Sequence, residues 1–232
     1  MKALLALLVA GKLGKILLSG GSMLLSIVVY GELFGWRYAV GFVALLLAHE
    51  MGHYVAARQR GLQVGLPTFI PFVGAWINLR TQELDPETVA FVGMAGPLLG
   101  STAAFVVFLV ATQYQLPWLM AVAYAGFVLN LFNLIPITPL DGGHIVGVIS
   151  PKLWILGVPL LVGLYFWRPS PLLIIIAIMA VPRLLALFRG QLPPTASQLP
   201  KLSERLRYAS EYLGLVVLLI LLAFEAGPVR GA

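Results

Sequence analysis

Long apolar runs, separated by short segments that carry charges or prolines, dominate this chain of 232 residues. A helix needs about 17 to 25 mostly apolar residues to cross a bilayer. Runs of this kind occur near residues 18–35, 37–60, 88–112, 117–136, 152–167, 171–189 and 208–226. Only 10% of all residues are charged, whereas soluble domains average about 25%. The pattern predicts an all-α, multi-pass membrane protein with about six to seven transmembrane helices.

The 15 lysines and arginines are spread unevenly around these runs. If the N-terminus is cytoplasmic, only Arg37, Arg168 and Arg230 fall on the opposite side, which agrees with the positive-inside rule. The basic residues lie at the ends of apolar runs rather than on one face, so the net charge of +6 reflects membrane topology. No nucleic-acid partner is expected.

Residues 1–16 differ from the later runs because Lys12 and Lys15 interrupt their apolar stretch. No small-residue cleavage site precedes the next apolar run, which argues against a cleaved signal peptide. We interpret residues 1–16 as a retained amphipathic segment that lies on the membrane surface.

The sequence HEMGH, from His49 to His53, stands at the end of an unbroken apolar run. Residues four apart lie about 40° apart around a helix axis, so the two imidazoles can reach one metal ion. The chain has no cysteine, which excludes thiolate ligands. Zinc held by such a pair lowers the pKa of its water, and Glu50 beside it can accept the proton during attack on a peptide carbonyl.

Two histidines leave a zinc site incomplete, and residues 130–144, NLFNLIPITPLDGGH, supply a third ligand. Pro136 and Pro139 should end the fourth helix near the cytoplasmic side. Asp141 is then expected on unwound backbone that faces the second helix. Its carboxylate could instead cap the N-terminus of a helix over residues 142–149, or do both.

HEMGH on one predicted transmembrane helix and NLIPITPLDGGH near the end of another resemble the site-2 protease family of intramembrane zinc metalloproteases. AGPLLG at residues 95–100 also resembles a GP-containing motif of that family. Its Gly96 and Gly100 have the GxxxG spacing, which favours close packing of helices. The resemblance covers about Gly41 to Ile149. Without a PDZ domain or another appended regulatory domain, the chain resembles a compact member.

The resemblance implies that one Zn²⁺ ion is the cofactor, that His49, His53 and Asp141 bind it, and that Glu50 is the general base. It also implies regulated cleavage of transmembrane protein substrates in the bilayer. We expect a single integral membrane protease domain over residues 1–232. Its parts are a catalytic core at 37–150 and C-terminal helices at 151–232, with a proline-bearing linker at 190–200.

Three further polar residues lie near the second motif. Asn133 is a candidate to hold the substrate backbone or the oxyanion at the scissile carbonyl. An interhelical hydrogen bond is an equally good interpretation of Asn133, and Asn130 also needs a partner inside an apolar helix. His144 could donate a hydrogen bond to a metal ligand, although a polar histidine on a helix face explains it more simply.

Residues 62–80 do not read as a spanning helix, because Gly65, Pro67, Pro71 and Gly74 divide them into pieces of strand length. They suggest a re-entrant strand or hairpin that lines the catalytic cavity. A surface loop that dips into the lipid headgroups is the alternative. We expect a substrate helix to unwind and add as a strand to the edge presented by residues 69–79.

Two alternatives to this enzyme remain open at the level of sequence. The protein could bind zinc without proteolysis, as a metal carrier or an inactive regulator that binds helices. The third ligand could be Glu204 or Glu211 instead of Asp141. A bacterial cytoplasmic membrane is expected, with the active site nearer the cytoplasmic side, about 16 Å along the helix from Arg60 to His49. The oligomeric state is left open, a homo-oligomer included.

Overall fold

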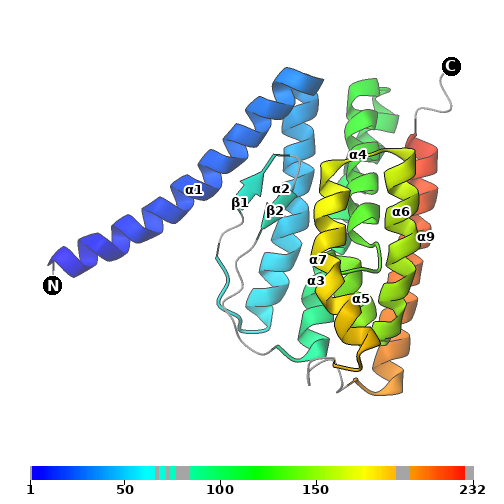
Figure 1. Ribbon diagram of the computed structural model, residues 1–232. Helices are drawn as coiled ribbons and strands as arrows, with labels where there is room; N and C mark the ends of the chain where they lie inside the picture. The colour runs from blue at the N-terminus through cyan, green and yellow to red at the C-terminus, as the bar shows by residue number, and fades with distance from the viewer. Residues whose placement is uncertain (1, 66–67, 72–73, 77–83, 192–198, 228–232) are drawn as a thin grey trace.

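The computed structural model describes residues 2–65, 68–71, 74–76, 84–191 and 199–227, and the chain is mostly helical there. The helices are α1 (Lys2–Phe34), α2 (Trp36–Gln59), α3 (Pro86–Gln113), α4 (Pro117–Asn133), α5 (Asp141–Ile149), the 3-10 helix η1 (Pro151–Leu156), α6 (Gly157–Trp167), α7 (Pro171–Phe188) and α9 (Leu202–Ala226) (Figure 1). Each predicted apolar run is helical.

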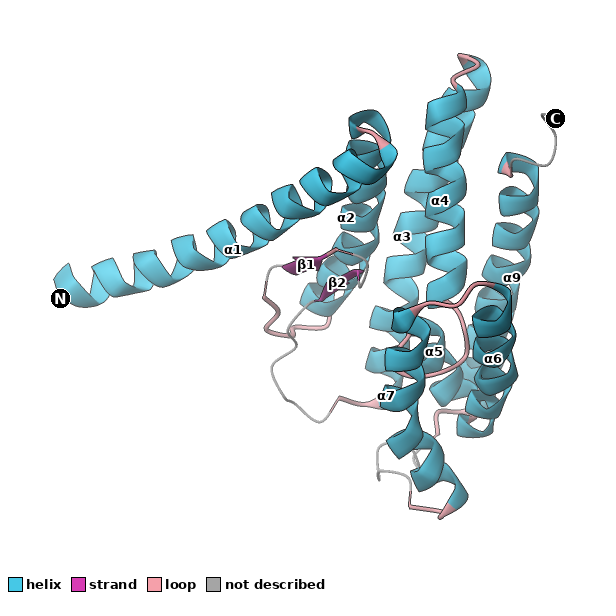
Figure 2. Cartoon of the chain, turned by 45° about the horizontal axis from the view of Figure 1, so that its top comes forward, coloured by secondary structure: helices cyan, strands magenta, loops and turns pink. Residues whose placement is uncertain are grey.

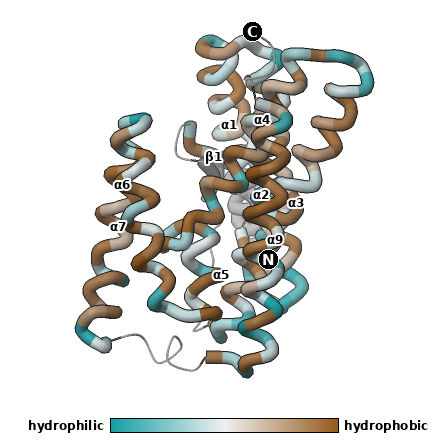
Figure 3. The backbone as a smooth tube through the Cα atoms, turned by 90° about the vertical axis from the view of Figure 1, so that its right-hand side faces the viewer, coloured by the Kyte–Doolittle hydropathy of each residue, from teal (hydrophilic) through white to brown (hydrophobic). Residues whose placement is uncertain are grey.

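Four helices, α2, α3, α7 and α9, are long and apolar enough to cross a membrane. Shorter apolar helices cover Leu18–Phe34, Pro117–Asn133 and Pro151–Trp167. Large apolar side chains are exposed on the outer helices, with Phe166 81% and Ile178 65% accessible. In Figure 3, brown, hydrophobic colour runs along most of α6 and α7. Lipid rather than water is the solvent that such a surface suits, and the protein is an integral membrane protein.

Proline and glycine set the helix boundaries. Pro86, Pro117 and Pro171 each open a helix, where the absent N–H would have no intrahelical partner. Asp85 caps α3, its carboxylate accepting from the Thr88 N–H at 2.9 Å. Only Gly35 separates α1 from α2, with φ of +88° that glycine adopts readily.

The bundle is organised around α3, which packs against α2, α4, α5 and α9. Phe127, Ile145 and Leu219 are fully buried in the core shared by these helices. The pair α6 and α7 stands to one side (Figure 3). It is joined to the bundle through η1 and through the loop after α4, where Ile137 packs with Leu161 and Ile176. The blue helix α1 runs obliquely away from the bundle towards the N-terminus (Figure 1).

A short antiparallel pair of strands, β1 (Thr68–Ile70) and β2 (Gly74–Trp76), lies between α2 and α3 in sequence, with Phe69 opposite Ala75. The strand β1 lies against α1 and β2 against α2 (Figure 2). Residues 77–79, also assigned to the substrate-binding edge, are outside the described residues, as are residues 192–198 of the expected linker. The membrane depth of the strand pair stays a prediction.

Two expectations need correction. Asp141 does not lie on unwound backbone: it is the first residue of α5, and Leu140 holds the capping position without a side-chain bond. The chain resumes a helix directly after Pro139 because Gly142 and Gly143 allow the first turn of α5 to pack against the backbone of Leu134 and Ile137. In addition, residues 2–16 are not a separate segment: they continue into the first predicted span as one helix, α1.

Candidate metal centre

His49, His53 and Asp141 converge on one point between α2 and α5. The Nε2 atoms of the two histidines lie 3.1 Å apart. The Oδ2 atom of Asp141 lies 3.2 Å from Nε2 of His49 and 3.3 Å from Nε2 of His53. In the described part of the chain, this is the group of at least three histidine or acidic side chains that could hold a metal ion. The structure thus brings together the three ligands expected from two distant motifs.

Hydrogen bonds to the far side of each imidazole fix its protonation. Nδ1 of His53 lies 2.8 Å from the carbonyl oxygen of Val92, which can only accept, so this nitrogen carries the hydrogen. Nδ1 of His49 lies 2.8 Å from Oδ1 of Asn130. The Asn130 amide nitrogen donates to the carbonyl oxygen of Gly126 at 2.7 Å, so its oxygen faces His49. As neutral rings with the hydrogen on Nδ1, both imidazoles present an Nε2 lone pair to the same point.

This arrangement leaves three electron-rich atoms facing one another without a donor between them. Oδ2 of Asp141 is buried and has no hydrogen-bond partner among the described residues. One added proton would satisfy one pair of atoms, whereas a divalent cation would satisfy all three. The separations of 3.1 to 3.3 Å also agree with the edges, about 3.3 Å, of a tetrahedron with bonds of about 2.0 to 2.1 Å. The three side chains fit a zinc ion.

Glycines on α2 and α3 create the space that the imidazoles occupy. A Cβ atom on Gly96 would overlap the ring of His53, and one on Gly100 would lie 3.0 Å from Cβ of His49. A Cβ atom on Gly52 would meet the carbonyl of Ala95. The GxxxG spacing of α3 was expected to serve helix packing, and it also makes room for metal-ligating side chains.

Aromatic side chains from later helices hold the backbone that carries Asp141. The hydroxyl of Tyr212 on α9 donates to the carbonyl of Leu134 at 2.5 Å, just after α4 ends. The indole N–H of Trp154 in η1 donates to the carbonyl of Gly143 at 2.8 Å. The first turn of α5 is therefore tied to two helices outside the motif itself.

Glu50 is 6% exposed and follows the ligand His49 on α2. No hydrogen bond or ion pair joins its carboxylate to another described residue. The three candidate ligands, by contrast, all have polar contacts. A carboxylate buried within a membrane protein is costly, which makes a chemical use of this group the better explanation.

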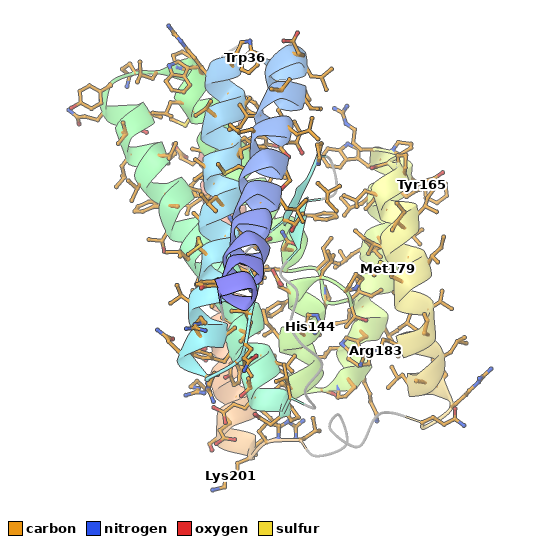
Figure 4. All side chains as sticks on the ribbon, turned by 90° about the vertical axis from the view of Figure 1, so that its left-hand side faces the viewer. Trp36, His144, Tyr165, Met179, Arg183 and Lys201 are labelled. Atoms are coloured by element: carbon orange, nitrogen blue, oxygen red, sulfur yellow. The ribbon has the colours of Figure 1, made fainter. Side chains whose placement is uncertain are left out.

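The other predicted candidates lie less directly at this centre. Asn133 is the last residue of α4, and its amide nitrogen donates to the carbonyl of Leu129 in its own helix at 3.0 Å. His144 lies one turn after Asp141 on α5, in the half of the protein nearer Lys201 (Figure 4). It is Asn130 that forms the hydrogen bond with Nδ1 of His49. The sequence analysis predicted only that this amide needs a partner inside an apolar helix.

The alternative third ligands are not part of the cluster. Glu211 pairs with Arg207 on α9 at 3.9 Å, and Glu204 lies in the first turn of that helix. Neither joins the histidines among the described residues. Asp141 takes this place.

Two histidines and a carboxylate thus converge inside a helical membrane protein. This combination defines the class as a membrane protein with a candidate metal centre. Residues 37–119 match the model of Peptidase family M50. The match includes HEMGH and AGPLLG but ends before Asn130, so the geometry described above links the second motif to the first. These findings confirm the resemblance to intramembrane zinc metalloproteases.

Curated relatives agree with this match. The chain is 28% identical over 123 residues to a zinc metalloprotease of Methanocaldococcus jannaschii, covering 50% of this chain and 35% of that protein. It is 31% identical over 122 residues to a protein of Synechocystis sp. and 35% identical over 124 residues to one of Mycobacterium tuberculosis, both provisionally named zinc metalloproteases. These two alignments cover 48% and 49% of this chain, and 32% and 31% of the relatives. The chain thus matches about a third of the length of each relative.

Proposed function

We propose that this protein is an intramembrane zinc metalloprotease that hydrolyses peptide bonds within or near the transmembrane segments of membrane-protein substrates. One observation carries the proposal: His49, His53 and Asp141 turn three ligand atoms towards one point, and the buried carboxylate of Glu50 follows His49 on α2. The zinc metalloproteases among the relatives support the same activity.

The ligand set supports zinc as the metal, and each side chain has a distinct task. His49, His53 and Asp141 would hold the ion, which when bound polarises the scissile carbonyl and acidifies water. Glu50 accepts a proton from the attacking water and later delivers it to the amide nitrogen as the C–N bond breaks. The products are a carboxylate and an amine, and no covalent bond to the protein forms.

Asn133 completes the proposed site as a group that binds substrate. One hydrogen of its amide nitrogen is used within α4, and the second remains to donate to a substrate carbonyl or the developing oxyanion. Its position at the end of α4, before the loop that leads to Asp141, supports this role.

The proposed topology has seven spans with a cytoplasmic N-terminus. Trp36 and Tyr165, next to Arg37 and close to Arg168, lie at one end of the bundle, and Lys201 lies at the other (Figure 4). This separation supports the orientation expected from the positive-inside rule. The site would then lie nearer the cytoplasmic face of a bacterial membrane, within a core at residues 37–150 that the helices of residues 151–232 support.

The strand pair beside α2 supports a mode of substrate binding. We propose that it is re-entrant and that an unwound substrate segment pairs with it, because an exposed strand edge binds main chain with little demand on sequence. Unwinding also exposes the peptide bond that a helix would shield.

A non-proteolytic zinc protein, either a carrier or an inactive regulator, is the competing function. A carrier needs a path of polar ligands through the membrane, whereas the described residues provide one cluster. An inactive regulator has no use for the carboxylate of Glu50. Both features favour the protease.

Proteoliposomes that contain the purified protein and a panel of single-span substrates would test the proposal. Chelation should stop the cleavage, and one equivalent of Zn²⁺ should restore it. Zinc transport into the vesicles without cleavage of any substrate would identify a carrier, and stoichiometric zinc with neither activity would identify a regulator.

A further inference from the structure

We propose that Asn130 is a positioning residue that selects the metal-binding tautomer of His49. This inference rests on the proposed zinc site. It adds a residue of α4 that touches neither metal nor substrate. The contact that carries it is the 2.8 Å hydrogen bond between Oδ1 of Asn130 and Nδ1 of His49.

The Asn130 amide is held in one orientation by its own helix. Its nitrogen donates to the carbonyl of Gly126, one turn earlier, at 2.7 Å. The side chain is fully buried, with an accessible fraction of 0%, so no water competes for either end. Rotating the amide by half a turn would place its N–H groups against Nδ1 of His49 and its oxygen against the Gly126 carbonyl oxygen, where two acceptors would repel each other.

This fixed oxygen determines which nitrogen of His49 carries the hydrogen. A neutral imidazole has one N–H, and an acceptor at Nδ1 places it there. Without that acceptor, the hydrogen would be more stable on Nε2, because Oδ2 of Asp141 lies 3.2 Å from Nε2 and would accept a hydrogen bond from it. The imidazole would then donate to Asp141 and lose the lone pair that binds the metal. Asn130 thus prevents a bond between two ligands that would compete with zinc.

The two histidines are controlled in different ways. Nδ1 of His53 donates to a backbone carbonyl, that of Val92, which no side-chain substitution removes. The tautomer of His49 depends on a single side chain. A substitution of Asn130 can therefore remove the Nδ1 hydrogen bond of a metal-binding histidine without changing any of the three candidate ligands.

The helix α3 leaves space for this contact. A Cβ atom on Gly100 would overlap Oδ1 of Asn130 and would lie 3.0 Å from both its Nδ2 atom and Cβ of His49. The bond between α2 and α4 thus passes directly across Gly100 of α3. Substituting this glycine by alanine offers a second route to disturb the same bond while Asn130 itself remains.

Zinc affinity, measured by chelator competition on the full-length protein in detergent, tests the inference. Asn130→Leu has a similar size but no acceptor, and its affinity for Zn²⁺ should fall about 10- to 100-fold, as is usual when the partner of a ligating histidine is lost. Asn130→Asp keeps the acceptor oxygen towards His49 and, when its other oxygen is protonated, can donate to the Gly126 carbonyl as asparagine does, so it should restore most of the affinity. Thr102→Val is the control, because the Thr102 hydroxyl donates to the carbonyl of Leu98 within its own helix, and it should bind zinc like the wild type.

Rescue by aspartate separates positioning from a merely structural role. Equal losses of affinity in Asn130→Leu and Asn130→Asp would overturn the inference, and so would unchanged affinity in Asn130→Leu. If Asn130→Leu does not fold, the tautomer of His49 in the zinc-free wild type decides the question: ring ¹⁵N chemical shifts that place the hydrogen on Nδ1 support the inference, and shifts that place it on Nε2 overturn it. Wild-type protein that binds no zinc would instead overturn the proposed function, so the two failures are distinguishable.

Discussion

The Nε2 atoms of His49 and His53 lie 3.1 Å apart, and as neutral rings with the hydrogen on Nδ1 they turn lone pairs towards each other. In each ring the hydrogen lies on Nδ1, where it is donated to Oδ1 of Asn130 by His49 and to the carbonyl of Val92 by His53. Two lone pairs at this distance repel each other, and Oδ2 of Asp141 adds negative charge to the same point. This arrangement of buried polar groups suits a bound cation.

Removing the carboxylate of Asp141 should weaken zinc binding more than any change outside the ligand set. Asp141→Ala takes away one of three ligands, so the loss of affinity should exceed the roughly 10- to 100-fold effect of outer partners. Glu211→Ala is the matched control, because Glu211 pairs with Arg207 away from the site. Zinc content after purification measures both. Loss of zinc in Glu211→Ala with retention in Asp141→Ala would contradict the assignment.

A methyl group on Gly96 should disturb the metal site by a steric clash with His53. The Cβ atom of Gly96→Ala would overlap the ring of His53, so the imidazole must move and zinc binding should fall. Overpacking of this kind costs about 1 to 3 kcal/mol of stability. Gly163→Ala adds the same methyl group where nothing lies within 4 Å, so it should leave zinc affinity unchanged and should not lower stability, since alanine favours a helix over glycine. Thermal unfolding and zinc affinity of the two variants check this difference.

The cap of α3 should contribute stability that depends on pH. Burial alone would raise the pKa of Asp85, but hydrogen bonds from Thr88 and the charge of Arg60 outweigh it, so the pKa lies below its ordinary value. Stability from a lowered pKa is present above the unfolded value and is lost as pH falls through the folded one. Asp85→Ala should therefore cost about 0.5 to 1 kcal/mol at neutral pH.

The same cost should shrink when the carboxyl group of Asp85 is protonated. Unfolding of wild type and Asp85→Ala at pH 7 and at about pH 3, below the usual aspartate value of about 3.9, measures the change. A destabilisation that is equal at both pH values would show that the charge of the cap is not what stabilises α3.

A proline in β2 tests the proposed binding of substrate as a strand. Ala75 is paired with Phe69 in the strand pair, and Ala75→Pro removes an N–H and restricts the backbone. Cleavage of helical substrates should fall while zinc content stays at the wild-type level, since no zinc ligand lies on β2. Ala75→Val, which suits a strand, is the control. Unchanged turnover in Ala75→Pro would contradict this mode of binding.

Sequence alone could predict the features that depend on local pattern. The apolar runs became helices near the expected boundaries, and HEMGH placed His49 and His53 on one face of α2 because helical periodicity is a local property. The prediction of Asp141 as a third ligand came from the second motif and its family resemblance, with Glu204 and Glu211 left open, and the structure places its carboxylate beside both histidines. These inferences needed no knowledge of how the helices pack.

The features that escaped prediction depend on packing between segments distant in the sequence. Asn130 and Asn133 are the same residue type three positions apart on one helix, and only the approach of α2 decides that Asn130 meets His49. The role of Gly96 likewise appears only when α3 lies against the imidazole of His53. The start of α5 at Asp141 depends on contacts of Gly142 and Gly143 with the preceding loop.

Cleavage by Glu50→Gln at full zinc occupancy is the most direct test of the account. The amide keeps the size of the carboxylate and leaves all three ligands intact, so the variant should retain one zinc ion per chain. It should lose roughly 10²- to 10⁴-fold in the cleavage rate of a single-span substrate, because glutamine cannot accept the proton of water. Zinc-loaded Glu50→Gln that cleaves at the wild-type rate would contradict the assignment of Glu50 and the mechanism built on it.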